Sequence, residues 1–275
     1  MTIQSRFQSV DSTTDPLYFV RYVDRLSSNP EIIRCRKIAI EFIARDVPCS
    51  VVEIGCGVGD IAAQVAGLFP DCRVLGLDKS KTMLEESRRR HAGIPNLEFR
   101  EGSFAELLSL RADVVWIERV LIHCDDPENA LKISADSLQL SGRLIVIEPD
   151  WGTLVVNGVE PRLAGLWTAD LTNVQLSGTV GRQLPLLFRK NSIALERHEV
   201  AFLPFKTKAE LDNLINLERT ISNSVNRKAM STAEGLELMK QFSDADEKEE
   251  LLGFVALVIA MGHKVGPASS TDTDK

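Results

Sequence analysis

The sequence predicts an α/β protein in which helices cover both faces of a mainly parallel sheet. Two observations support this fold class. Short apolar runs alternate with segments of helical periodicity between residues 50 and 150, which is the pattern of successive βαβ units. The chain also has 275 residues, of which 44% are hydrophobic, and this is enough to bury one large core. We therefore expect a single domain with helical additions.

Seven segments are predicted as strands. The first five alternate with helices, and the last two are separated by a long helical stretch. The predicted strands span residues 50–55, 73–78, 96–101, 113–120, 143–147, 195–205 and 252–264.

The predicted helices precede, connect and follow these strands. Asp126 followed by Pro127 is a favourable start for one of them, because Asp caps the free N–H groups and Pro suits the first position. The predicted helices span 16–27, 30–44, 60–69, 80–91 and 127–139, with longer helical inserts at 160–190 and 208–249.

Charge and composition exclude several classes of partner. The formal net charge is −7, which argues against a nucleic-acid partner, since such proteins present a basic face. No apolar run is long enough to span a bilayer, and the polar start of the chain does not resemble a signal peptide. The five cysteines form no CxxC pair, so we expect reduced thiols and a cytoplasmic location.

A glycine-rich segment stands between the first strand and the following helix. It reads EIGCGVGD from Glu53 to Asp60, and its glycines allow a tight turn and a close approach to a ligand. Dinucleotide folds carry GxGxxG here, but Asp60 occupies the place of the last glycine. Glu53 would repel a pyrophosphate and suits a positively charged ligand. Asp78 ends the second strand nineteen residues after Gly59 and can accept two ribose hydroxyls.

These motifs resemble those of a known family. VVEIGCGVGD (51–60) and VLGLDKS (74–80) are similar to the first two motifs of class I S-adenosylmethionine-dependent methyltransferases. EGSF (101–104), ERVLIH (118–123) and GRL (142–144) extend the resemblance, which covers residues 15–265. It is strongest to the small-molecule branch that includes ubiquinone, menaquinone and natural-product tailoring methyltransferases. The resemblance implies a Rossmann-like, seven-stranded, mostly parallel sheet with an antiparallel last strand.

The resemblance also implies a cofactor and the residues that bind it. Asp78 would hold the ribose, Ser103 and Phe104 the adenine, and Glu118 with Arg119 the methionyl end. Many relatives have Asp where Ser103 stands, so a weaker hydrogen bond to the adenine is expected. Tyr22 either closes over the cofactor or is a core aromatic. The residues assigned to S-adenosylmethionine are Tyr22, Glu53, Gly55, Cys56, Gly57, Asp60, Asp78, Lys79, Met83, Ser103, Phe104, Glu118 and Arg119.

In this view the chain is one methyltransferase domain with four parts. Residues 1–48 form a helical preface, and residues 49–150 form the cofactor-binding half. Residues 151–265 form the acceptor-side half with its helical inserts, and residues 266–275 form a small, polar tail expected to be disordered.

The acceptor is expected beyond the ends of the fourth and fifth strands. His123 is the candidate base, because an unperturbed imidazole titrates near neutral pH; its alternative role is to order the loop. Asp150 is a candidate second base or orienting carboxylate, and its alternative is a turn residue. Trp151 is a candidate for the wall of the acceptor pocket, and its alternative is core or lid packing. Arg182 and Gln183 are candidates to reach a polar acceptor, and their alternative is a place on the surface of a helix.

Several other functions are excluded or left open. Residues 123–126 (HCDD) do not predict a metal site, because adjacent side chains diverge and no second ligand group follows. No proline-rich run follows the fourth strand as in enzymes that methylate base amino groups, so a small organic acceptor is expected. O-methylation is favoured by the His123 base. C- and N-methylation, a non-methylating cyclase on the same fold and a homodimeric assembly stay open.

Overall fold

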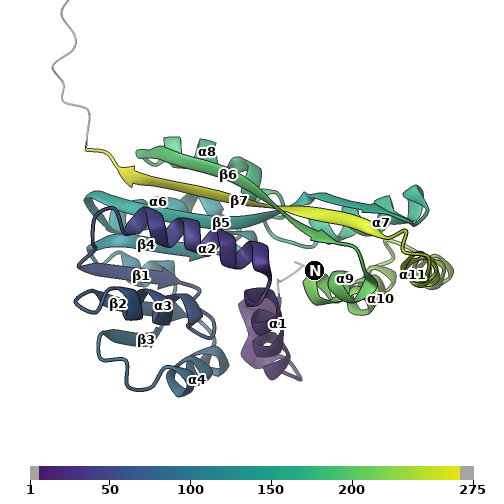
Figure 1. Cartoon of the computed structure of the whole chain (residues 1–275), viewed down its shortest axis with the longest axis horizontal. Helices are drawn as coiled ribbons and strands as arrows, with labels where there is room; N and C mark the ends of the chain where they lie inside the picture. Colours follow the sequence, from purple (N-terminus) through teal and green to yellow (C-terminus); the bar gives the residue numbers. More distant parts are fainter. Residues whose placement is uncertain (1–5, 267–275) are drawn as a thin grey trace, which may run out of the picture.

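The structure, a computed structural model, describes residues 6–266. Within this range seven strands form one sheet in the order β3-β2-β1-β4-β5-β7-β6 (Figure 1). The strands are β1 Ser50–Ile54, β2 Arg73–Asp78, β3 Leu97–Glu101, β4 Ala112–Glu118, β5 Leu138–Asn157, β6 Ile193–Phe205 and β7 Leu252–Lys264.

Strands β1 to β5 pair in parallel, whereas β7 runs antiparallel to both β5 and β6. The predicted mostly parallel, Rossmann-like sheet with an antiparallel last strand is confirmed. Because β1 and β4 are neighbours and β2 lies on the other side of β1, the loops after these three strands open at one edge of the sheet. This edge is where α/β proteins bind their ligands.

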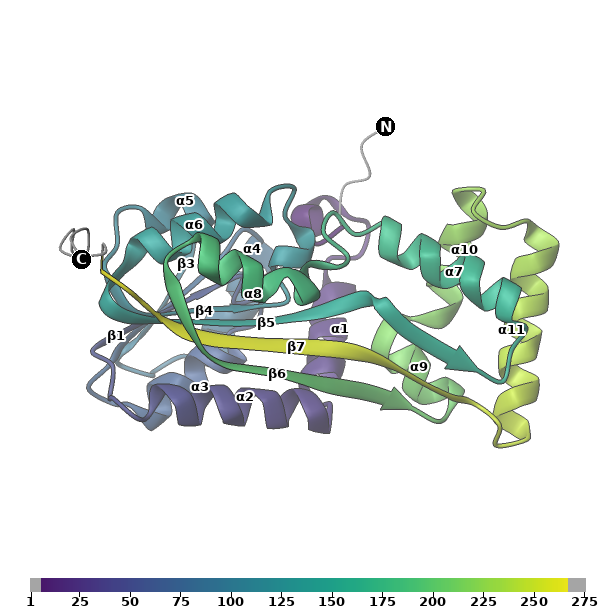
Figure 2. The ribbon, with the colours of Figure 1, turned by 90° about the horizontal axis from the view of Figure 1, so that it is seen from above.

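Two layers of helices cover the sheet. The helices α2 and α3 pack against one face, and α5, α6 and α8 pack against the other (Figure 2). The helical segments are η1 Arg6–Ser12, α1 Leu17–Ser27, α2 Pro30–Ile43, α3 Asp60–Leu68, α4 Lys81–Arg90, α5 Phe104–Leu107, η2 Leu121–His123, α6 Pro127–Ser137, α7 Pro161–Asn173, α8 Val180–Lys190, α9 Lys208–Ile215, α10 Leu217–Asn226 and α11 Thr232–Glu247.

Local sequence signals account for several helix starts. Asn29 accepts hydrogen bonds from the N–H groups of Glu31 and Ile32, and Pro30 follows it at the first helical position. The predicted cap at Asp126 is confirmed, because its carboxylate accepts a hydrogen bond from the Asn129 N–H at 2.9 Å. Both predicted inserts are largely helical and contain α7 with α8, and α9 to α11.

The fifth strand corrects the sequence prediction. It was expected to span residues 143–147, the apolar run of this segment. Instead β5 continues to Asn157, and its pairing with β7 resumes after an irregularity between Asp150 and Val155. The hydrogen-bonded partner strand, which local sequence does not reveal, sustains the ladder across these residues.

The extended strands β5, β6 and β7 reach well beyond β1 to β4, and α7, α9, α10 and α11 gather at their far ends (Figure 2). The helix α1 stands between these helices and the strands β1 to β3 (Figure 1). No helix among residues 6–266 is long and apolar enough to cross a membrane. The predicted disordered tail lies, apart from Gly266, outside the described residues.

Candidate functional site

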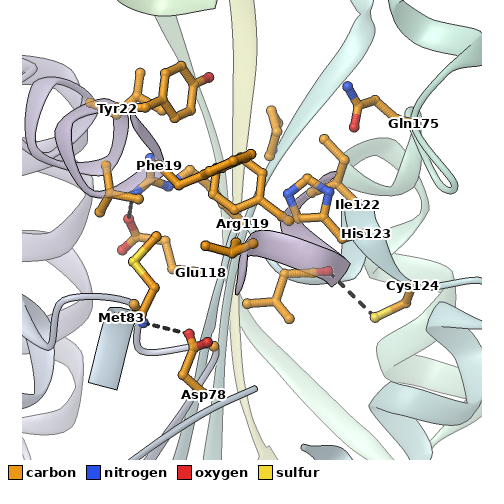
Figure 3. Close-up of a pocket in the computed structure, with 18 of the residues that line it drawn as sticks. Phe19, Tyr22, Asp78, Met83, Glu118, Arg119, Ile122, His123, Cys124 and Gln175 are labelled. Atoms are coloured by element: carbon orange, nitrogen blue, oxygen red, sulfur yellow. Dashed lines mark hydrogen bonds and ion pairs between the residues drawn. The ribbon is translucent and has the colours of Figure 1, made fainter. Parts of the chain in front are cut away.

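A cavity of about 610 Å³ opens at the carboxyl ends of β1, β2 and β4. The glycine-rich loop and the end of β2 line one side of it, and α1, α9 and α10 line the other. All thirteen residues assigned to the cofactor from the resemblance line this cavity, as does His123 (Figure 3). Residues far apart in the sequence therefore meet in one cavity.

The glycines after β1 form a cradle that other residues would fill. Gly55 and Gly57 have φ values of +67° and +53°, a region that strains residues with a Cβ. A Cβ on Gly55 would lie 2.4 Å from a methyl carbon of Val120. At Gly57 the nearest atom would be a methyl carbon of Val23 at 3.9 Å, so this backbone faces open space.

Asp78 fixes the cradle from the neighbouring strand. Its Oδ2 accepts a hydrogen bond from the Gly57 N–H at 2.8 Å, and its Oδ1 accepts one from the Ser80 N–H at 2.8 Å. Burial raises the pKa of Asp78, although these backbone N–H groups oppose the shift. The carboxylate lines the cavity, so its remaining lone pairs face the space where a ribose would lie.

The end of β4 carries a buried cluster of charged side chains, of which the sequence motifs indicated Glu118 and Arg119. Arg36, on α2, donates to both carboxylate oxygens of Glu118 at 2.7 to 3.1 Å. Arg119 lies 3.2 Å from the same carboxylate. Burial alone would raise the pKa of Glu118, but the two guanidinium groups outweigh it and lower the pKa. Arg36 has no motif of its own, so sequence reasoning missed it.

Arg119 is held in an unusual backbone conformation with an unused donor. Its φ is +58°, which is rare for a residue with a long side chain. Its Nε is buried and has no hydrogen-bond partner among the described residues. A buried donor of this kind is costly unless a ligand satisfies it. The orphaned N–H suits a carboxylate, such as that of the methionyl group of S-adenosylmethionine.

Glu53 differs from the sequence expectation in its charge. It is buried, and its carboxylate accepts a hydrogen bond from the Ala62 N–H at 2.9 Å. Burial, reinforced by the nearby Glu118, raises the pKa of Glu53 to about 8. Without a ligand this group is therefore mostly protonated at neutral pH. An adjacent cation would favour its ionised form.

The four residues that the resemblance assigns to the adenine, Met83, Phe104, Lys79 and Ser103, line the cavity. Ser103 begins α5 and donates its hydroxyl hydrogen to the Glu106 carboxylate at 2.9 Å in a capping box. Its hydroxyl is therefore already engaged. The contact of Ser103 with the adenine stays a prediction.

The N-terminal segment lies beside the cavity and forms hydrogen bonds with elements on two sides of it. Asp11 accepts hydrogen bonds from the Ser80 hydroxyl at 2.7 Å and from the Lys81 N–H at 2.8 Å, at the start of α4. On the other side, the Tyr22 hydroxyl donates to the Leu214 carbonyl of α9 at 3.0 Å. Tyr22 thus lines the cavity and joins α1 to α9, and burial raises its pKa to about 12.

His123 lies at the end of η2 and faces the cavity (Figure 3). Its ring stacks on Phe7 with centroids 4.9 Å apart. Burial, followed by the charge of Arg119, lowers the pKa of His123 to about 4. The imidazole is therefore neutral at physiological pH and a weaker base than its ordinary pKa indicates.

Asp150 does not lie where the sequence analysis placed it. It is buried with 1% exposure, does not line the cavity, and accepts hydrogen bonds from Arg182 Nε at 2.5 Å and Nη2 at 2.8 Å. This ion pair corrects the expectation of a second base, and it also turns Arg182 away from an acceptor. Gln183 lies outside the cavity lining, whereas Trp151 lines it as expected.

Glu148 has a supporting role that sequence reasoning missed. Its carboxylate accepts hydrogen bonds from the N–H groups of Val120, Leu121 and Ile122 at 2.6 to 3.3 Å. Burial raises its pKa to about 8. Because these three residues lead directly to His123, Glu148 fixes the turn that carries the imidazole.

Comparisons with known proteins agree with the fold and the cradle. Residues 46–218 match the model of the methyltransferase domain family, and the chain belongs to this family of class I S-adenosylmethionine-dependent methyltransferases. S-adenosylmethionine is therefore the cofactor of this protein, and the chemistry of the glycine cradle, Asp78 and the orphaned Nε of Arg119 is compatible with its ribose and methionyl groups.

Two curated relatives and one solved structure are similar to parts of this chain. An uncharacterized 37.1 kDa protein of transposon TN4556 from Streptomyces fradiae is 27% identical over 75% of this chain and 61% of its own length. Trans-aconitate 2-methyltransferase from Methylobacterium radiotolerans is 34% identical over 53% of this chain and 57% of its own length. The matches thus span about three fifths of these relatives.

The plantazolicin methyltransferase BpumL, solved in complex with S-adenosylhomocysteine, superimposes with a TM-score of 0.56 at 15% identity over 94% of each chain. At this identity the likeness concerns the fold.

Proposed function

We propose that this protein transfers a methyl group from S-adenosylmethionine to an oxygen atom of a small organic metabolite, in secondary-metabolite or quinone-like biosynthesis. The observation that carries the proposal is the shared cavity. One open cavity of about 610 Å³ is lined both by the glycine cradle and by residues of α1, α9 and α10. Its volume is that of a site for small molecules.

S-adenosylmethionine supplies a methyl group on a positively charged sulfur and leaves as a neutral thioether. The protein contributes placement and exclusion of water. Asp78 and the glycine cradle fix one end, and the cluster of Arg36, Glu118 and Arg119 fixes the other. The segment η1 and the helix α1 cover the space between, so that an acceptor is held in line with the sulfur.

The electrostatics of the acceptor side favour an acidic oxygen as the methyl acceptor. An alcohol would need a base, but the low pKa of His123 makes it a weak one. A carboxylate, an enolate or an acidic phenol arrives deprotonated, and the nearby guanidinium of Arg119 further favours its anionic form. In this scheme neutral His123 orients the acceptor. The relative whose name gives trans-aconitate as its substrate is consistent with an acceptor of this kind.

The test is methyl transfer to defined acceptors by the purified protein. Carboxylic acids, phenols and alcohols of similar size are incubated with S-adenosylmethionine, and the products are analysed by mass spectrometry. We expect a mass gain of one CH2 unit, methyl ester or ether products, and stoichiometric S-adenosylhomocysteine. Binding of the cofactor without any mass gain in a converted substrate would contradict the proposal and favour a cyclase or rearrangement enzyme.

A further inference from the structure

The wall of the cavity formed by α10 carries basic and amide side chains that the cofactor side does not use. Asn216, Arg219, Asn223 and Arg227 all line the cavity. Residues 219, 223 and 227 follow one another at intervals of four, so they lie along one face of the helix. The opposite face of α10 is buried in the core. The helix therefore presents a row of hydrogen-bond donors to the cavity.

The two arginines of this row differ in their partners. Arg227 is neutralised by Asp170 of α7, which accepts from its Nε at 3.2 Å and from its Nη2 at 2.5 Å. Arg219 forms no ion pair within the described residues 6–266. Its guanidinium lies over the ring of Tyr18, 4.2 Å from the centroid. The part of the cavity wall formed by α10 thus carries one positive charge, that of Arg219, without a carboxylate to balance it.

Arg219 is held in place by its surroundings. The Tyr18 hydroxyl accepts a hydrogen bond from Asn216 Nδ2 at 2.9 Å, which fixes the ring beneath the guanidinium. Asn216 itself has a φ of +54° at the junction of α9 and α10. A guanidinium over an aromatic face makes no hydrogen bond to the ring, so the N–H donors at its edge stay available for a planar anion. Such preorganisation is typical of a binding group.

This charge lies on the acceptor side of the cavity. In Figure 1, α10 is separated by α1 from the strands β1 to β3, which carry the cradle and Asp78. Arg119 provides the donor that suits the methionyl carboxylate, so the cofactor does not require Arg219. The lining of the same cavity also includes the apolar side chains of Leu214, Val255 and Leu257.

We infer that Arg219, assisted by the Asn223 amide one turn further along α10, binds a carboxylate group of the methyl acceptor at the end away from the methylated oxygen. The acceptor is then an amphiphilic organic acid whose apolar body packs between this anchor and His123. A single guanidinium with neutral amides matches one carboxylate, whereas a phosphate calls for more positive charge. The inference rests on the proposed function and specifies its substrate class.

The test compares carboxylic acids with their primary amides as ligands of the protein saturated with S-adenosylhomocysteine. The probes are 3-phenylpropanoate, cinnamate and cyclohexylacetate, each paired with its amide, and affinities are measured by isothermal titration calorimetry. Arg219→Gln removes the charge, and Arg219→Lys keeps it. Arg21→Gln is the matched control, because Arg21 lies on the outer surface of α1 and pairs with Asp15.

We expect the wild type and Arg21→Gln to bind at least one acid more tightly than its amide. Arg219→Gln should weaken binding of that acid by roughly ten- to a hundredfold, as expected for loss of a charge-assisted hydrogen bond. Binding of the amide and of S-adenosylhomocysteine should stay unchanged, which also shows that the variant is folded, and Arg219→Lys should retain part of the preference.

The inference is overturned if no acid binds more tightly than its amide, or if the preference survives Arg219→Gln. Failure of the proposed function looks different, because then the wild type would not bind S-adenosylhomocysteine or would not transfer a methyl group to any acceptor.

Discussion

The buried ion pair of Arg36 and Glu118 allows one quantity to be measured: the loss in the free energy of unfolding when a buried carboxylate loses its main partner. Their side chains are 11% and 4% exposed and share three hydrogen bonds. Replacing Arg36 by Met removes the main partner of the buried carboxylate. Such losses cost about 3 to 5 kcal/mol in the free energy of unfolding, and we expect about 3 kcal/mol because Arg119 still lies 3.2 Å from Glu118.

The assay is urea unfolding at neutral pH, followed by circular dichroism. Lys37→Met is the matched control on the same helix, because the Lys37 side chain is 76% exposed, and it should cost less than about 0.5 kcal/mol. The double variant Arg36→Met/Glu118→Gln should recover much of the loss, since the buried charge is then gone. If Arg36→Met is no less stable than Lys37→Met, or if the double variant recovers nothing, the reasoning is wrong.

Three further predictions concern the cofactor and the candidate base. Because the pKa of Glu53 is about 8 and the sulfonium charge of S-adenosylmethionine lowers it, binding of S-adenosylmethionine at pH 7 should release up to about one proton, detected as buffer-dependent calorimetric heat and lost in Glu53→Gln. Heats that do not depend on the buffer would contradict this. Gly57→Ala should weaken that binding at least about tenfold, since its added Cβ would project into the cavity that Gly57 lines, whereas Gly93→Ala, with φ +89° and a position outside the cavity lining, should lose stability but not affinity. Because the pKa of His123 is about 4, its ring is already neutral above about pH 6. We therefore expect His123→Gln to leave the shape of the rate–pH profile unchanged between about pH 6 and about pH 8. A step in the wild-type profile at about pH 6.5 that vanishes in the variant would refute this.

The proximity of the glycine turn and Asp78 could be predicted from local sequence, because both lie in short segments with fixed spacing. The turn after β1 needs glycines at fixed positions, and Asp78 must end the adjacent strand, so spacing alone brings the two together. The same holds for the cap at Asp126. These features depend on residues a few positions apart or on neighbouring parallel strands, and both relations can be derived from the sequence pattern.

The rest of the cavity lining could be predicted only in part, because it is assembled by packing. Arg36, Phe7 and Arg219 come from helical segments whose position on the sheet no local pattern specifies. Asp150 was misplaced for a related reason. Its pairing with Arg182 and the continuation of β5 beyond it both depend on partners distant in sequence. His123 was found, but its lowered pKa follows from burial and from Arg119, which only the folded chain reveals.

The long strands β5 and β7 have a consequence for how this protein can change its substrate. They pair from Arg143 with His263 as far as Asn157 with Leu252, with an irregularity between Asp150 and Val155, so the same two strands support both halves of the molecule. The helices α7, α9, α10 and α11 rest on their far end and contribute no residue to the glycine cradle. On the proposed function, substitutions in these helices would alter the choice of acceptor more than the affinity for the cofactor. Selection, or a designer exchanging these helices between relatives, would then explore new acceptors while the methyl donor site is inherited intact.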